Sequence, residues 1–306
     1  MSPIRVVDLL VHVAVALLLP PLLLGVINKT KAFFGGRVGP PLVQPYRDIW
    51  RLLRKDTVVS TTTTWVFRAG PVVSLATASV AALLVPLGGA QSPMAFTGNF
   101  VLFAYLLGLG RFFTILAALD TGSAFEGMGA AREATFSALA GPALFLGLVA
   151  LARASGSLEL GDMLGGSGSL WARAGASLVL VIASLVVVVL AENSRIPFDD
   201  PNTHLELTMI HEVMVLDHSG PMFGMILYGA AMKLLVLGSL VVNLTVPVTG
   251  TSLWLSWPLF VGGMLVLAVV VGVVESSMAR LRLVQVPSLL VGACLLSGFG
   301  VVMLVR

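Results

Sequence analysis

Charged side chains are scarce in this sequence of 306 residues, since only 11% are Asp, Glu, Lys or Arg. Soluble domains carry about 25% charged residues, so this chain lacks the polar surface that a water-soluble globule needs. By contrast, 57% of the residues are hydrophobic and the mean hydropathy is +1.00. The composition therefore excludes a water-soluble globule and indicates an integral membrane protein.

Cysteine is almost absent, because Cys294 is the only one in the chain. One thiol cannot form an internal disulfide, and iron–sulfur clusters need several thiolates. Any redox centre would then belong to a partner or be held by histidine. However, His204, His211 and His218 are spaced too far apart for one metal, and HEVMV at 211–215 lacks the second histidine of the zinc motif HExxH. We therefore expect no metal site and no cofactor in this chain.

Long apolar runs are what the chain has in abundance. Eight of them are near or above the roughly 20 residues that cross a bilayer. They cover about 6–27, 71–90, 99–119, 134–153, 171–193, 222–246, 254–275 and 284–305. The sequence predicts an all-α polytopic membrane protein with about eight transmembrane helices, in which residues 1–306 form a single integral membrane domain.

The basic residues predict how these helices are oriented. With the N-terminus outside, the inner loops hold 12 of the 18 Lys and Arg residues, and the outer segments hold 4. The positive-inside rule then places both termini outside the cytoplasmic (inner) membrane. This asymmetry explains the net charge of +3 without a nucleic-acid partner. The predicted inner loops are 28–70, 120–133, 194–221 and 276–283.

Two of the inner loops carry informative patterns. In the first, PYRDIWRLLRKD at 45–56 places apolar residues on one helical face and basic residues mostly opposite. This pattern predicts an interfacial amphipathic helix, which could be a simple membrane anchor. The loop 194–221 is polar and 28 residues long, whereas about four residues can join two helices. We therefore expect this loop to bind or dock another component.

Several ionisable residues fall within the predicted helices or at their ends, where each costs roughly 3 kcal/mol or more without a partner or water. Lys233 lies about eleven residues into its helix, which is roughly 16 Å at 1.5 Å per residue. Structural ion pairing and an ion path both remain open, with pairing favoured for Glu133 and Glu275 and a path favoured for Lys233 and Arg111. The predicted ion-path residues are Arg111, Asp120, Glu133, Glu192, Lys233 and Glu275.

Four sequence motifs resemble the respiratory complex I subunit 1 family. GRVGPPLVQPYRDIWRLLRKD at 36–56 and AENSRIPFDDPNTHLEL at 191–207 are similar to that family's first and third inner loops. GRFFTILAALDTGSAFEGMGAARE at 110–133 and ESSMARLRL at 275–283 resemble, more closely, the membrane subunits of group 4 NiFe hydrogenases. Within that group, the resemblance is to the formate hydrogenlyase subunit 4, or hydrogenase component C, type. It covers residues 28–283.

The resemblance implies a subunit that docks a hydrophilic electron-transfer arm onto a membrane arm. In complex I relatives it also forms part of a quinone pocket and an acidic entrance to a proton path. The implied partners are hydrogenase-like small and large subunits, iron–sulfur proteins and antiporter-like membrane subunits, which would hold the iron–sulfur clusters and the NiFe centre. The residues that match the docking-loop motifs, besides Glu192, are Arg37, Gly39, Pro40, Gln44, Arg195, Pro197, Phe198, Asp199, Pro201 and Glu206.

The leading hypothesis is therefore a non-catalytic membrane subunit of an energy-converting hydrogenase or formate hydrogenlyase-like complex, which couples redox chemistry to proton or sodium translocation. The alternatives are a quinone-binding subunit 1 of a complex I-type dehydrogenase and a free-standing ion transporter. Two departures weaken the quinone alternative. The chain has Ala140–Gly141–Pro142 where the family carries a glutamate, and Asn202 and His204 where quinone-linked relatives carry carboxylates.

Overall fold

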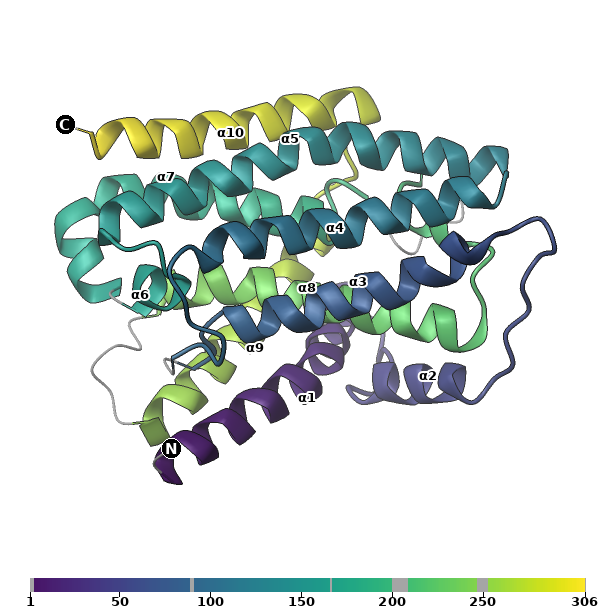
Figure 1. Ribbon diagram of the computed structural model, residues 1–306, viewed down its shortest axis with the longest axis horizontal. Helices are drawn as coiled ribbons and strands as arrows, with labels where there is room; N and C mark the ends of the chain where they lie inside the picture. The colour runs from purple at the N-terminus through teal and green to yellow at the C-terminus, as the bar shows by residue number, and fades with distance from the viewer. Residues whose placement is uncertain (1–2, 89–90, 166, 200–208, 247–252, 306) are drawn as a thin grey trace.

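The computed structural model describes residues 3–88, 91–165, 167–199, 209–246 and 253–305, and it contains helices and no strand in these ranges (Figure 1). The helices are α1 (Pro3–Phe34), α2 (Gln44–Leu53), α3 (Trp65–Leu84), α4 (Asn99–Asp120), α5 (Ala124–Ser155), α6 (Leu160–Gly165), α7 (Ser167–Glu192), α8 (Gly220–Thr245), α9 (Leu253–Ser277) and α10 (Val286–Met303), with short 3₁₀ turns η1 (Glu212–Val215) and η2 (Leu283–Gln285).

Eight of the described helices are long and apolar enough to cross a bilayer, which confirms the predicted fold class. They are α1, α3, α4, α5, α7, α8, α9 and α10. Helix α8 is the most enclosed, with 72% of its most apolar stretch buried, while large apolar side chains such as Tyr105 and Val266 face outward on other helices. A polar side chain in the middle of α8 is therefore surrounded by protein, and the outward apolar side chains suit lipid.

The predicted loop 120–133 is wrong, because α5 already begins at Ala124 and only residues 121–123 join α4 to α5. The charged residues of this stretch lower its hydropathy, but they do not break a helix. Gly129 in this stretch has a packing role, because a Cβ there would lie 2.3 Å from the Val213 side chain of η1. The prediction of a late start for the second span, at residue 71, is also wrong, since α3 begins at Trp65.

The two ends of the helix bundle differ in what they carry. In Figure 1 both chain termini lie at the left end, and α2 lies at the right end. We call the right end the loop end, because it carries α2 and the described parts of the connection between α7 and α8, residues 193–199 and 209–219. The predicted amphipathic helix is confirmed as α2, which packs against α8 and α1. Which end faces the cytoplasm stays a prediction of the basic-residue pattern.

Two tyrosines attach neighbouring helices to α1. Pro21 has no N–H, so the carbonyl of Leu17 has no partner in the helical pattern. The hydroxyl of Tyr228 on α8 donates to this carbonyl at 2.8 Å. The hydroxyl of Tyr46 on α2 donates to the neighbouring carbonyl of Leu18. Pro21 thus frees the acceptor that holds α8, and the adjacent carbonyl of Leu18 holds α2.

Candidate functional site

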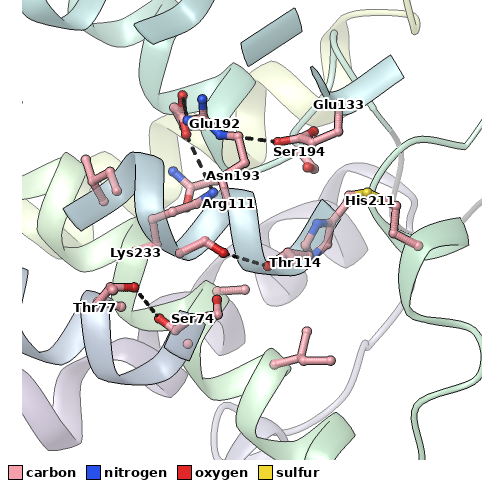
Figure 2. Close-up of a pocket in the computed structure, with 17 residues that line it drawn as sticks. Ser74, Thr77, Arg111, Thr114, Glu133, Glu192, Asn193, Ser194, His211 and Lys233 are labelled. Atoms are coloured by element: carbon pink, nitrogen blue, oxygen red, sulfur yellow. Dashed lines mark hydrogen bonds and ion pairs between the residues drawn. The ribbon is translucent and has the colours of Figure 1, made fainter. Parts of the chain in front are cut away.

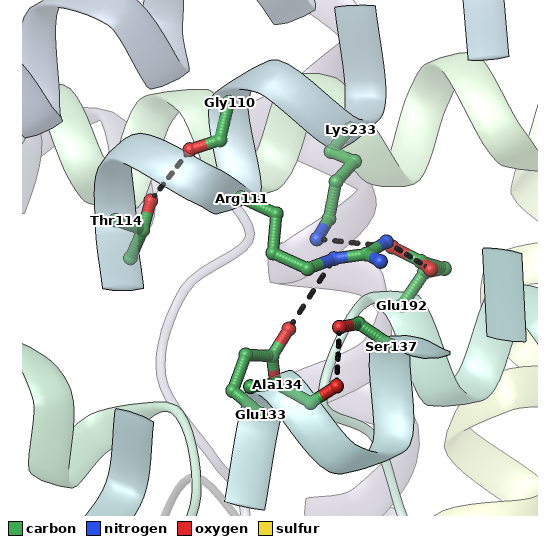
Figure 3. Close-up of polar contacts among 8 residues, drawn as sticks. All are labelled: Gly110, Arg111, Thr114, Glu133, Ala134, Ser137, Glu192 and Lys233. Atoms are coloured by element: carbon green, nitrogen blue, oxygen red, sulfur yellow. Dashed lines mark hydrogen bonds and ion pairs between the residues drawn. The ribbon is translucent and has the colours of Figure 1, made fainter. Parts of the chain in front are cut away.

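Four ionisable side chains from four different helices meet inside the bundle (Figure 3). Glu192, the last residue of α7, accepts a hydrogen bond from Arg111 of α4. Its other carboxylate oxygen lies 3.6 Å from the ammonium nitrogen of Lys233 on α8. Arg111 also lies between two acids, since its Nε is 3.6 Å from Glu133 of α5. We call these four residues the central cluster.

The central cluster is electrically balanced and largely enclosed. Two cations and two carboxylates cancel, which lowers the cost of placing them away from water. The Glu192 side chain is only 2% exposed, whereas that of Lys233 is 24% exposed. The contact between Lys233 and Glu192 is long, and the Lys233 side chain is more accessible than that of Glu192. Of the two ion pairs of Glu192, the one with Lys233 therefore separates more readily. Glu192 can then keep Arg111 while it loses or regains Lys233.

The central cluster borders a cavity of about 60 Å³ that is wide enough for water (Figure 2). Hydroxyl groups line it alongside the charges. Thr77 donates to the carbonyls of Val73 and Ser74, and Thr114 donates to that of Gly110, so both hydroxyl oxygens can accept hydrogen bonds on their cavity side. The cavity thus joins buried charges to groups that can orient water.

A second set of ion pairs stabilises the loop end. The Glu275 carboxylate, fully buried on α9, lies 2.8 Å from Lys31 of α1 and 3.3 Å from Arg195. Asp199 pairs with Arg280 at 2.9 Å, so the loop after α7 and the loop after α9 are tied together. Arg195 and Asp199 therefore act within the chain as organisers of the loop.

A second cavity, of about 220 Å³, lies at the loop end and is lined by Arg195, Asp199 and Glu212. Burial, with the Asp199 carboxylate nearby, raises the pKa of Glu212 above its usual value. The two cavities share a wall, which includes His211. Burial and the Lys233 cation lower the pKa of His211 to about 4, so this imidazole is neutral near pH 7. This second space, which we call the loop-end cavity, has no counterpart in the sequence pattern.

The structure separates the predicted ion-path residues into three groups. Arg111, Glu133, Glu192 and Lys233 come together in the central cluster. Glu275 belongs to the loop-end ion pairs instead. Asp120 lies elsewhere, where it accepts from the backbone N–H groups of Thr64 and Phe67 at 2.7 and 3.2 Å. It caps the start of α3, a structural task that makes no contact with the central cluster.

The residues that match the docking-loop motifs also divide by exposure. Arg37, Gly39 and Pro40 are exposed at the loop end, and Gln44 begins α2, where it donates to Asp48 at 2.8 Å. The remaining described residues lie beneath the surface: Pro197, Phe198 and Asp199 are buried, and Arg195 is partly buried. Pro201 and Glu206 lie outside the described residues, as do Asn202 and His204.

Several residues at these sites were missed by the sequence patterns. The sequence pattern identifies Lys31 and Arg280 only as basic loop residues, and it presents His211 only as a possible metal ligand. Ser74, Thr77 and Thr114 carry no signal, because hydroxyl residues in membrane helices usually bond to their own backbone. In the ranges that the structure describes, no group of three or more His, Cys, Asp or Glu side chains could hold a metal ion.

Several known proteins are similar to this chain in sequence. Residues 7–306 match the family described as NADH dehydrogenase. The chain is 32% identical over 286 residues to formate hydrogenlyase subunit 4 of Escherichia coli (strain K12), covering 90% of each. It is 34% identical over 242 residues to hydrogenase-4 component C of the same organism, covering 79% of this chain and 76% of that one.

A solved structure of an archaeal respiratory membrane complex, the membrane-bound sulfane sulfur reductase, contains a chain with the same fold. The TM-score is 0.83 at 20% sequence identity, and the match covers 97% of this chain and 98% of the other. The arrangement of helices in this chain is therefore a known fold.

Proposed function

Because the chain belongs to the NADH dehydrogenase family that includes complex I subunit 1, we propose that it is the membrane-arm subunit of an energy-converting hydrogenase or formate hydrogenlyase-like complex. The names of two relatives, a formate hydrogenlyase subunit and a hydrogenase-4 component, support this assignment. In this proposal, hydrogenase-like and iron–sulfur subunits carry the redox centres, and antiporter-like subunits lie beside the chain in the cytoplasmic membrane.

The loop end provides the docking face of this proposal. It carries the exposed residues Arg37, Gly39 and Pro40 and the basic helix α2. The ion pairs of Glu275 and Asp199 hold the loops beneath that face in one arrangement. A hydrophilic arm that docks here would lie directly over the loop-end cavity, with both chain termini on the opposite, outer side.

The coupling of redox chemistry to ion movement is assigned to the central cluster. The observation that carries this assignment is that one buried carboxylate, Glu192, is shared by Arg111 and Lys233 beside a cavity that can hold water. When the Lys233 contact opens, the free carboxylate oxygen of Glu192 can take up a cation. When it closes, Lys233 replaces that cation. Such exchange of partners is how buried ionisable groups pass protons or sodium ions.

The test uses the whole complex in sealed vesicles with Glu192→Gln and Lys233→Met. Both variants are expected to keep hydrogen-evolving activity with a soluble electron donor, because the redox centres lie in other subunits. Both are expected to lose ion uptake by about tenfold or more, as for other buried proton-transfer groups. Glu126→Gln is the matched control, since this buried carboxylate caps the backbone N–H of Asp217 at 3.0 Å, away from the central cluster.

Wild-type ion uptake in both variants would contradict the assignment of the central cluster. Copurification tests the remaining alternative. A free-standing transporter would move ions after purification alone, whereas a complex subunit is expected to copurify with iron–sulfur proteins. Isolation of an active single chain would therefore contradict the proposed membrane-arm function.

A further inference from the structure

We propose that His211 is a proton relay that connects the loop-end cavity with the central cluster. This inference rests on the proposed ion path and deepens it, because it names the proton as the coupling ion and His211 as its point of entry. The argument depends on the position of one side chain between two cavities, on the groups that line each cavity, and on the way in which the loop holds that side chain.

The two cavities meet at a wall that only a few residues form. Five residues line both spaces: Asn193, Ser194, His211, Ile226 and Ala230. Of these five, His211 is the one whose neutral ring carries both a nitrogen that can accept a proton and a nitrogen that can release one near pH 7. Asn193 and Ser194 can bind water, but their side chains do not exchange protons in this range. A proton that crosses this wall through a side chain therefore crosses at His211.

The two cavities on either side of His211 both carry ionisable groups. The loop-end cavity carries Asp199, Glu212 and Arg195, and Glu212 is the carboxylate there whose raised pKa suits it to collect protons. The central cavity carries Glu133 and Glu192 with their two cations. In the view of Figure 2, His211 lies at one side of the central cavity and Lys233 at the other. His211 thus stands between the cavity that holds Glu212 and the cluster to which the ion path is assigned.

The backbone holds His211 in this position. Its N–H and that of Ile210 both donate to the same carboxylate oxygen of Asp199, each at 3.0 Å. The other oxygen of Asp199 is paired with Arg280. In the described ranges, no residue hydrogen-bonds to either ring nitrogen of His211, so both nitrogens can hydrogen-bond to water. A fixed backbone with an uncommitted ring suits a relay better than a structural anchor does.

The relay step is balanced in protons and charge. One ring nitrogen accepts the excess proton of a hydronium ion in the loop-end cavity, which becomes water, and the other nitrogen releases its proton to a water beside the central cluster, which becomes the new hydronium ion. The ring is neutral before and after the step, and rotation about its side-chain bonds restores the first tautomer. The Lys233 cation and burial disfavour a doubly protonated ring, so the imidazole does not trap the proton.

The experiment compares His211→Gln with His218→Gln in the intact complex, reconstituted in vesicles. His218 is the matched control, because it is a buried histidine of the same loop whose ring stacks on Phe67 at 4.0 Å and lines neither cavity. His211→Gln is expected to assemble, to retain hydrogen evolution with a soluble donor, and to lower proton uptake by about tenfold or more. His218→Gln is expected to keep wild-type proton uptake.

A second variant distinguishes a proton relay from a purely structural role of His211. His211→Ala leaves room for a free imidazole molecule, so added imidazole is expected to restore proton uptake in this variant only. Restoration supports the relay, because a structural role would not respond to a diffusible base. Failure of imidazole to restore uptake, wild-type uptake in His211→Gln, or sodium uptake in place of protons would overturn it. Failure of both His211 variants to assemble would assign the residue to loop folding and also overturn the relay.

The outcomes also separate this inference from the proposed function. If Glu192→Gln loses ion uptake while His211→Gln retains it, the central cluster is a coupling site and the relay alone is wrong. If both variants retain uptake, the ion-path assignment fails together with the relay.

Discussion

Two of the buried carboxylates in this protein, those of Glu192 and Glu275, each have two cationic neighbours rather than one. Glu192 lies between Arg111 and Lys233, and Glu275 lies between Lys31 and Arg195. A charge buried away from water needs several partners to offset its lost hydration, so two contacts at one carboxylate are physically reasonable. The two carboxylates differ in surroundings. Glu192 borders the water-sized central cavity, whereas Glu275 joins three segments of the loop end and lines neither of the two cavities.

We therefore expect Glu275 to stabilise the fold rather than to move ions. Glu275→Gln should lower the apparent Tm in detergent more than Lys31→Met does, because loss of the shared carboxylate leaves two cations unpaired. The expected cost is about 3 kcal/mol, the usual order for breaking a buried pair. Asp56→Asn, at an exposed position of the first loop, is the control. A Tm for Glu275→Gln equal to that of the control would show that the ion pairs contribute nothing.

At the scale of elements, helix α2 depends on its neighbours for its position. It contains no buried residue and its exposed face carries Arg47, Arg51 and Trp50, so its own sequence provides little to hold it. Helix α8 supplies a close approach at Gly224, where a Cβ would lie 3.3 Å from the Leu52 side chain. Helix α1 supplies the carbonyl of Leu18 for Tyr46. The position of α2 is thus set by α1 and α8 together.

Removal of the Tyr46 hydroxyl should loosen α2 without unfolding the bundle. Tyr46→Phe loses one hydrogen bond, worth about 1 kcal/mol, so amide hydrogen exchange within residues 44–53 should become about fivefold faster. Exchange in α10 should not change. Tyr105→Phe is the control, because this tyrosine is 73% exposed on α4. Unchanged exchange in α2 would mean that apolar contacts alone hold the helix.

At the scale of the whole molecule, the loop end and the terminal end should lie on opposite sides of the membrane. The proposed orientation places the loop end in the cytoplasm, because the loops there carry most of the basic residues. Single-cysteine variants in a Cys294→Ala background test it. A membrane-impermeant maleimide added to intact cells should label Leu158→Cys, near the terminal end, and should leave Ser60→Cys unlabelled until the membrane is opened. Both substituted positions are exposed. The reverse labelling pattern would invert the topology and move the docking face outside.

The sequence by itself determined the class of this protein, its eight spans and its amphipathic helix. These properties depend on the hydropathy of consecutive residues along the chain. Lipid favours apolar side chains, and the thickness of the bilayer sets the length of each apolar run. Depth along a span also singled out Arg111 and Lys233, because an ion that far from water needs a partner. None of this required knowledge of which helices touch.

Only the tertiary structure decided which charges meet. Arg111 and Glu192 are 81 residues apart, and their contact depends on how α4 and α7 pack. The same packing made Asp120 a cap for α3, placed Glu275 with Lys31, and brought His211 between two cavities. A hydropathy pattern records the cost of burying each residue, but it does not record the direction in which a side chain points. Pairing across helices is set by that direction, and it therefore appears only when the helices are assembled.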